Sequence, residues 1–188
     1  MDRVIVKSKY NKKYHYKFYR FHLLHRSMVV YLVIFASLLS IYLAINTTLD
    51  KKSTLPSVII SWVFVLFFLT FLPAIYIGRI KGIVKNIEKE RKDSYEIMEF
   101  TKSKITRIIE NVEGKAILGW ESFEAIYEFE DCYFLYIESD RGLVVVKSDI
   151  IEGDTQTFEK LAKKYMKPNK RGKINYKKMY KERVKWLI

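Results

Sequence analysis

The chain contains 188 residues, of which 49% are hydrophobic and 29% charged, and its formal net charge at pH 7 is +13. A single cysteine, Cys132, excludes an internal disulfide framework, and we expect it to be a small buried hydrophobe between two strands. The 7 glycines include no G-x-G-x-x-G order, and neither an HExxH motif nor a Ser-His-acid set is visible. We therefore expect no catalytic residues, no cofactor and no enzymatic activity.

The first 27 residues mix basic and aromatic side chains. Alternation over residues 3–9 predicts a short strand, and the sequence leaves open whether this strand joins a later domain. Residues 14–27 predict an interfacial helix, because aromatic rings and long cationic side chains suit the headgroup level of a membrane. His22 and His25 are spaced for one helix face, but two ligands without a neighbouring Cys, Asp or Glu are too few for a metal site. We expect no bound metal.

Two uncharged apolar runs follow, at residues 28–45 and 58–78. A helix needs about 20 mostly apolar residues to cross a hydrocarbon core of roughly 30 Å, and lipid forces the backbone into helices. The short polar linker 46–57 makes the two spans antiparallel, Pro56 suits the first turn of the second helix, and Pro73 predicts a kink. The alternatives are a helix pair in a soluble core and a cleaved signal peptide, and both fit runs of this length less well.

Lysines and arginines gather before the first run and after the second, whereas the linker holds two lysines. By the positive-inside rule, both termini face the cytoplasm, which predicts a multi-pass protein of the cell membrane. Basic residues near a membrane surface attract anionic lipid headgroups by about 1 kcal/mol each. The candidate membrane-surface contacts are Lys12, Lys13, Lys17, Arg20, Arg26, Arg79, Lys81, Lys85, Lys177, Lys178 and Trp186.

The charges are segregated along the chain. Residues 93–159 hold 16 acids and 6 bases, a net of −10, while the rest of the chain holds 5 acids and 28 bases, a net of +23. A basic protein often binds nucleic acid, but here the basic clusters flank the apolar runs and the C-terminus, so we expect no nucleic-acid partner. We expect an acidic domain instead, which by itself does not bind anionic headgroups.

Apolar residues of 79–93 recur with helical spacing and predict a basic linker helix, after which the period falls to about two. Asp154 is a candidate N-cap for a helix over 155–166, whose Phe158 and Leu161 cover the apolar face of the sheet. Short antiparallel strands are predicted at 95–101, 104–112, 115–121, 123–130, 132–138 and 143–147. On the strand 123–130, the candidate protein-partner face consists of Glu124, Glu128 and Glu130.

The tail, residues 167–188, is polybasic with interleaved aromatic residues. Three interpretations are open: a solvated tail, an amphipathic segment on the membrane surface, and a segment docked on the acidic domain.

The stretch "ILGWESFEAIYEFEDCYFLYIESDRGLVVVKSDI", followed by the helix "DTQTFEKLAKKY", resembles the YcxB-like family over roughly residues 94–166. Members are bacterial membrane proteins with a C-terminal domain similar to a pleckstrin-homology (PH) fold. Val145 and Val146 precede Lys147 where the family often has Ile-Pro. The resemblance implies an α+β membrane protein: a two-helix transmembrane hairpin followed by a small antiparallel PH-like β domain closed by a C-terminal helix. It implies no particular reaction.

Five segments are therefore expected: an interfacial segment 1–27, the hairpin 28–78, the linker helix 79–93, the PH-like domain 94–166 and the tail 167–188. The expected function is to present an acidic binding or scaffolding domain, at the cytoplasmic membrane surface, to a protein that the sequence does not identify. The alternative is self-immunity against cationic membrane-active peptides, which an acidic domain would attract. An oligomer is possible, because small residues within the spans permit close helix packing: Ala36, Ser37, Ser61 and Thr70. The same residues equally suit contact within the hairpin.

Overall fold

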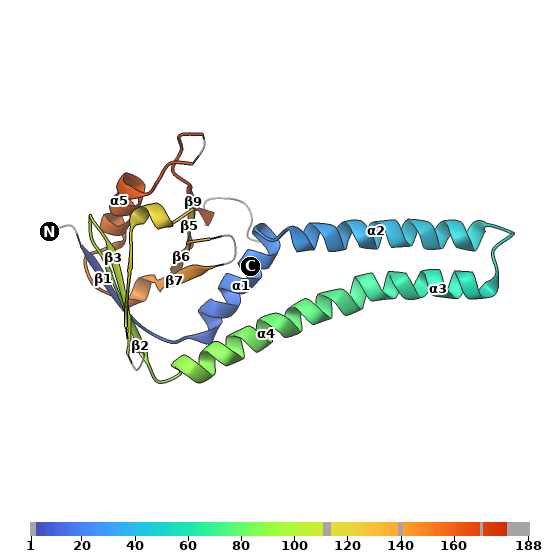
Figure 1. Cartoon of the computed structure of the whole chain (residues 1–188), viewed down its shortest axis with the longest axis horizontal. Helices are drawn as coiled ribbons and strands as arrows, with labels where there is room; N and C mark the ends of the chain where they lie inside the picture. Colours follow the sequence, from blue (N-terminus) through green and yellow to red (C-terminus); the bar gives the residue numbers. More distant parts are fainter. Residues whose placement is uncertain (1–2, 111–113, 139–140, 170, 180–188) are drawn as a thin grey trace. The chain divides into compact units, whose positions relative to one another are not determined.

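A computed structural model of the chain (Figure 1) describes residues 3–110, 114–138, 141–169 and 171–179. The chain forms two compact units. One unit, here called the helical unit, spans residues 19–85. The other, here called the sheet unit, combines residues 1–18 with residues 86–188.

Two antiparallel helices dominate the helical unit (Figure 1). Helix α1 (Lys12–His25) leads into α2 (Met28–Leu49), which begins where the Ser27 hydroxyl accepts a hydrogen bond from the Val29 N–H. The return helix consists of α3 (Leu55–Leu66), a π-helical turn η1 (Phe67–Phe71) and α4 (Leu72–Arg91). Each of the two helices, Met28–Leu49 and Leu55–Arg91, is long and apolar enough to cross a membrane.

The apolar surface of these helices is mostly exposed. In the most apolar 18-residue stretch of each helix, 17% of the residues are buried in α2 and 6% in the return helix. Phe35, for example, is 66% exposed. A helix pair in a soluble core would bury such side chains. The residues of α2 that are buried are small instead, namely Ser37, Ser40 and Ala44. The Ser37 hydroxyl donates to the Val33 carbonyl (2.7 Å), so burial leaves no unpaired hydroxyl there.

The predicted kink at Pro73 takes the form of the π turn just before it. Proline lacks an N–H and its ring collides with the carbonyl four residues earlier, here that of Leu69. The Leu72 N–H donates to the Phe67 carbonyl, five residues back, which widens the helix at this point. In Figure 1 the direction of α4 departs from that of α3 in this region.

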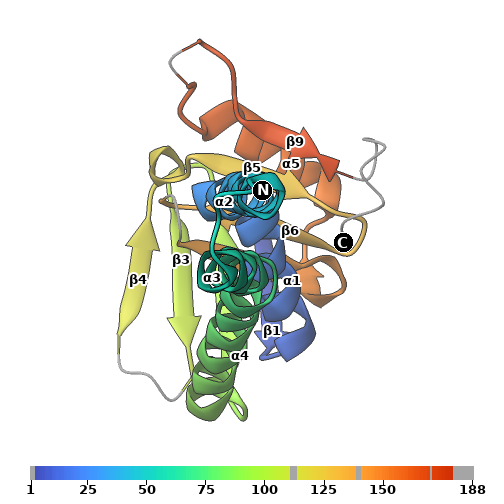
Figure 2. The same cartoon turned by 90° about the vertical axis from the view of Figure 1, so that its right-hand side faces the viewer.

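The sheet unit contains two sheets rather than the single predicted meander. All neighbouring strands are antiparallel except β5 and β9, which are parallel. Figure 2 shows β3 and β4 on one side of this unit, with β5, β9 and α5 on another. The first sheet has the order β4-β3-β2-β1-β8, with β1 Val4–Lys9, β2 Tyr95–Phe100, β3 Ile105–Ile109, β4 Lys115–Leu118 and β8 Ile150–Glu152. The second has the order β7-β6-β5-β9, with β5 Ala125–Glu128, β6 Cys132–Tyr136, β7 Gly142–Val146 and β9 Tyr176–Lys178.

The N-terminal strand predicted at residues 3–9 is confirmed, and it lies inside the first sheet. Strand β1 pairs with β2 from Val4↔Phe100 to Lys9↔Tyr95. In the sequence, the whole helical unit thus lies between β1 and β2, two strands that pair directly in one sheet. The sheet unit consequently extends beyond residues 94–166, because it also takes in β1, the start of α1 and part of the tail.

The predicted C-terminal helix is confirmed as α5 (Thr155–Tyr165), and Asp154 caps it by accepting a hydrogen bond from the Thr157 N–H (2.6 Å). Its buried face carries Phe158, Leu161 and Ala162. Phe158 is fully buried and belongs to an aromatic core that also holds Trp120. The Trp120 indole N–H donates to the Thr101 carbonyl (2.7 Å), so burying its polar atom leaves no unpaired donor.

Candidate functional site

The described part of the basic tail adds a strand to the edge of the second sheet. Strand β9 lies parallel to β5, the Ile126 N–H donates to the Asn175 carbonyl (2.9 Å), and the Asn175 amide donates to the Glu124 carbonyl (3.2 Å). Of the three interpretations of the tail, docking on the domain is therefore the one found for residues 174–179. The register is Ile126↔Tyr176, Tyr127↔Lys177 and Glu128↔Lys178.

Strand β5, the neighbour of β9, carries a buried carboxylate, that of Glu128, which is 5% exposed. One of its oxygens accepts a hydrogen bond from the Lys147 ammonium (2.8 Å). The other accepts one from the Tyr176 hydroxyl (2.8 Å) and lies 3.6 Å from the Lys178 ammonium. Burial and this hydrogen bond to Glu128 raise the pKa of Tyr176, so its hydroxyl stays protonated and donates. A buried charge is costly unless paired and hydrogen-bonded, and these three groups supply the pairing.

A second carboxylate, that of Glu159 on α5, also forms an ion pair with Lys178. Lys178 Nζ lies 2.6 Å from one Glu159 oxygen, and Lys163 Nζ lies 2.6 Å from the other. Burial raises the pKa of Glu159, but the hydrogen bonds from Lys163 and Lys178 outweigh burial and hold it below its usual value. Lys178 therefore joins two carboxylates, from β5 and from α5, to the tail.

The prediction of a partner face on the strand 123–130 is wrong for one of its three residues, Glu128. Glu124 and Glu130 are exposed, but Glu128 is buried and paired within the domain. Alternation placed Glu128 on the solvent side together with Ile126. Both are buried, because this side of β5 faces the core: Ile126 belongs to the hydrophobic core, and the Glu128 carboxylate contacts the side chains of Lys147, Tyr176 and Lys178.

Other basic residues of the N-terminal segment pair with the acidic segment in the same way. Lys17 Nζ lies 2.6 Å from Asp131, and Arg3 forms two hydrogen bonds with Glu152, each 2.6 Å long. By sequence the whole sheet unit, residues 1–18 and 86–188, holds 27 bases and 20 acids, a net of +7. The expectation of an acidic domain therefore fails, because folding brings the basic flanks into the same body as the acidic segment.

The candidate membrane-surface residues differ in their surroundings. The side chains of Lys17 and Lys178 are directed to carboxylates of the sheet unit, and Lys12 lies 3.5 Å from Glu88. Arg26 is half-buried, and Trp186 lies outside the described residues. Exposed positions, for which membrane contact stays a prediction, are Lys13, Arg20, Arg79, Lys81, Lys85 and Lys177.

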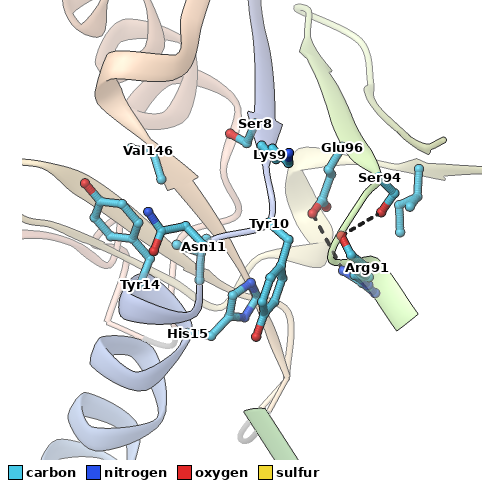
Figure 3. A pocket seen from close by; sticks show the side chains of 12 residues that line it. Ser8, Lys9, Tyr10, Asn11, Tyr14, His15, Arg91, Ser94, Glu96 and Val146 are labelled. Carbon is cyan, nitrogen blue, oxygen red and sulfur yellow. Dashed lines mark hydrogen bonds and ion pairs between the residues drawn. The ribbon is translucent and has the colours of Figure 1, made fainter. Parts of the chain in front are cut away.

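A small polar pocket lies where β1 ends and β2 begins (Figure 3). The ring of Tyr10 stacks on His15 at 4.8 Å between centroids, and Arg91 lies 3.6 Å from Glu96. The Ser8 hydroxyl is buried there with no hydrogen-bond partner. Burial, assisted by the nearby Arg91, lowers the pKa of His15 to about 4, so its imidazole is neutral at pH 7.

Among the residues that the structure describes, no cluster of three or more His, Cys, Asp or Glu side chains could hold a metal ion.

Neutral burial of His15 predicts a specific loss of stability in acid. The pKa is about 4 when folded and 6.5 when unfolded, so the unfolded chain binds the extra proton. This contribution to the free energy of unfolding is present above pH 6.5 and is lost as the pH falls toward 4. At pH 5 the loss is ~2 kcal/mol. In thermal unfolding of detergent-solubilised protein at pH 7.5 and 5, the variant His15→Phe, which keeps a ring against Tyr10, should lose less stability than the wild type. Equal losses would contradict this assignment.

Cys132 is fully buried, as expected for a small hydrophobe, and burial raises the pKa of its thiol to about 12. A thiol with so high a pKa is hardly ionised at neutral pH and is a poor nucleophile.

The chain is thus an α+β protein with two helices long and apolar enough to span a membrane, and with a separately packed two-sheet unit. Residues 100–162 of this unit match the family model described as YcxB-like protein, which confirms the resemblance seen in the sequence. Searches among curated proteins and among solved structures found no match.

Three residues of the site were missed by reasoning from the sequence: Lys147, Glu159 and Tyr176. Lys147 lies at the end of a predicted strand, and Glu159 lies in the predicted C-terminal helix, so local patterns do not place either of them beside Glu128 or the tail. The alternation of Ile174, Tyr176 and Lys178 was a signal for a strand, but the surrounding lysines and arginines favoured a reading as a basic tail.

Proposed function

We propose that the protein is a membrane-anchored binding protein whose hairpin crosses the cell membrane and holds the sheet unit at the cytoplasmic surface. The supporting observation is the insertion of two long, exposed apolar helices between neighbouring strands β1 and β2. Because β1 and β2 belong to one folded sheet, both ends of the hairpin lie on one side of the membrane. The excess of lysine and arginine at those ends favours the cytoplasmic side.

We further propose that the sheet unit has a PH-like fold. In chain order, β1 to β4 lie in one sheet and β5 to β7 in the second; β8 then returns to the first sheet, and the helix α5, which contributes Phe158 to the core, comes before β9. This order agrees with the domain that the family resemblance implies. PH-like sheets serve as binding modules, which supports a binding or scaffolding role.

A role in immunity against cationic peptides has less support. That idea depended on an acidic body that attracts cations over a long range. With 27 bases and 20 acids, the sheet unit gives no such attraction.

Cysteine labelling in intact cells tests the proposed anchoring. A membrane-impermeant maleimide should modify Lys52→Cys, in the linker between α2 and α3, without permeabilisation. It should modify Lys164→Cys, an exposed position of α5, only after permeabilisation. The wild type serves as the control, because its one cysteine is buried. Labelling of Lys164→Cys in intact cells, or release of the protein from membranes by alkaline carbonate, would overturn the proposal.

A further inference from the structure

The strand β9 reaches its place through a connector that depends little on the domain. Residues 167–169 and 171–173 are exposed. The connector closes on itself, because the Asn169 N–H donates to the Lys173 carbonyl (2.9 Å) and the Asn169 side chain accepts from the Arg171 N–H (2.9 Å). Gly172, at φ +72°, supplies the left-handed residue of this turn. The attachment of β9 therefore rests on the contacts of residues 174–179 themselves.

Without β9, strand β5 would be an edge strand of the second sheet. Its other side pairs with β6 over four residues, Ala125↔Tyr136 to Glu128↔Tyr133, and this pairing does not involve β9. An edge of this kind binds an extended segment by adding it as a strand. Main-chain hydrogen bonds then supply affinity, and contacts of alternate side chains supply specificity.

The segment in place shows what chemistry the edge accepts. The main chain is held by the hydrogen bond from the Ile126 N–H to the Asn175 carbonyl. Two alternate side chains are recognised: the Tyr176 hydroxyl donates to Glu128, and Lys178 lies between Glu128 and Glu159. Lys177, between them, is exposed and lies over the Tyr127 ring instead, 5.9 Å from its centroid. The recognised pattern is therefore Tyr-x-Lys in an extended conformation.

We propose that the β5 edge, with Glu128 and Glu159, is a binding site for an extended Tyr-x-Lys segment of a partner protein, and that β9 is the internal occupant that this segment displaces. The proposal deepens the proposed function, because it names the chemistry of the partner for a binding module and rests on that role. A tethered occupant on a short linker acts at millimolar effective concentration. The apparent affinity for the partner is therefore the intrinsic affinity of the open edge multiplied by the fraction of molecules in which the edge is open.

A disulfide that locks β9 in place provides the direct test. Tyr127 and Lys177 are register partners on β5 and β9, so the full-length double variant Tyr127→Cys/Lys177→Cys should close the edge when oxidised and free it when reduced. Binding of a fluorescein-labelled peptide of sequence KINYKKM, residues 173–179, is measured by anisotropy in detergent. We expect the oxidised form to bind no peptide and the reduced form to bind it. Equal binding by the two forms would overturn the proposal.

A matched pair of charge reversals identifies the lysine that holds the occupant. Lys178→Glu places a negative charge beside Glu128 and Glu159, which releases β9, and peptide affinity should rise at least about tenfold over the wild type. Lys177→Glu makes the same change of charge one residue away, at the exposed position, and should bind as the wild type does. A peptide that carries the Lys178→Glu change should bind to neither. Equal affinity of the two protein variants would contradict the proposal.

The two proposals fail separately. Peptide binding in detergent does not depend on membrane orientation, so absence of binding by a correctly labelled membrane protein overturns the peptide site alone. Conversely, a wrong labelling pattern overturns the anchoring and leaves the peptide measurement interpretable.

Discussion

Replacing Glu128 by alanine should destabilise the sheet unit by about 3 to 5 kcal/mol, the usual cost of removing one partner of a buried ion pair. The variant would leave the Lys147 ammonium, whose side chain is 17% exposed, without the carboxylate that it now contacts at 2.8 Å. It would also remove the acceptor of the Tyr176 hydroxyl and one of the two carboxylates around Lys178. Chemical unfolding of detergent-solubilised protein, followed by near-ultraviolet circular dichroism, measures the loss.

Two further variants separate the buried charge from the loss of side-chain bulk. Glu128→Gln keeps the shape and an acceptor oxygen but removes the charge, so we expect a smaller loss than with alanine. Glu124→Ala changes an exposed glutamate next to the same strand and should stay within about 0.5 kcal/mol of the wild type. If Glu128→Ala were as mild as Glu124→Ala, Glu128 would not be the buried anchor of the tail strand.

Replacing Phe158 by alanine should cost a similar amount, about 3 to 5 kcal/mol, because a large cavity would open in the core. Phe158 is fully buried, and its ring lies 5.0 Å from that of Phe100 and 4.5 Å from that of Tyr133, between centroids. It is the largest buried side chain of α5. Thermal or chemical unfolding of the same preparation measures the effect.

The control for this variant is Ile151→Ala, since Ile151 is apolar but 65% exposed. Its removal takes little apolar surface out of a buried environment, and we expect less than about 0.5 kcal/mol. A Phe158→Ala variant as stable as Ile151→Ala would mean that α5 does not close the core. Peptide binding at the β5 edge would then need another explanation, because α5 also carries Glu159.

Much of the architecture could be predicted from local patterns. Two long uncharged runs predict two membrane-length helices because hydropathy and length are properties of contiguous residues. The strands from β2 to β7 and the helix α5 follow from periods of two and 3.6, and Asp154 caps α5 as its residue type and position suggest. The predicted strands run longer than the observed ones, except the one at residues 143–147, because periodicity continues into the turns while the hydrogen-bonded ladder does not.

The positions of the apolar helices, the strands and one capped helix could be predicted, because they depend on residues close together in the chain. Which distant segments pair is visible only in the folded chain. Val4 meets Phe100 across the whole helical unit, and Glu128 meets Lys178 across α5. Partners so far apart leave no periodic trace, so an exposed glutamate could not be told from a buried one on alternation alone. For the same reason, an apparently acidic domain with a basic tail proved to be one folded unit in which the tail supplies a strand and neutralises the carboxylates beneath it.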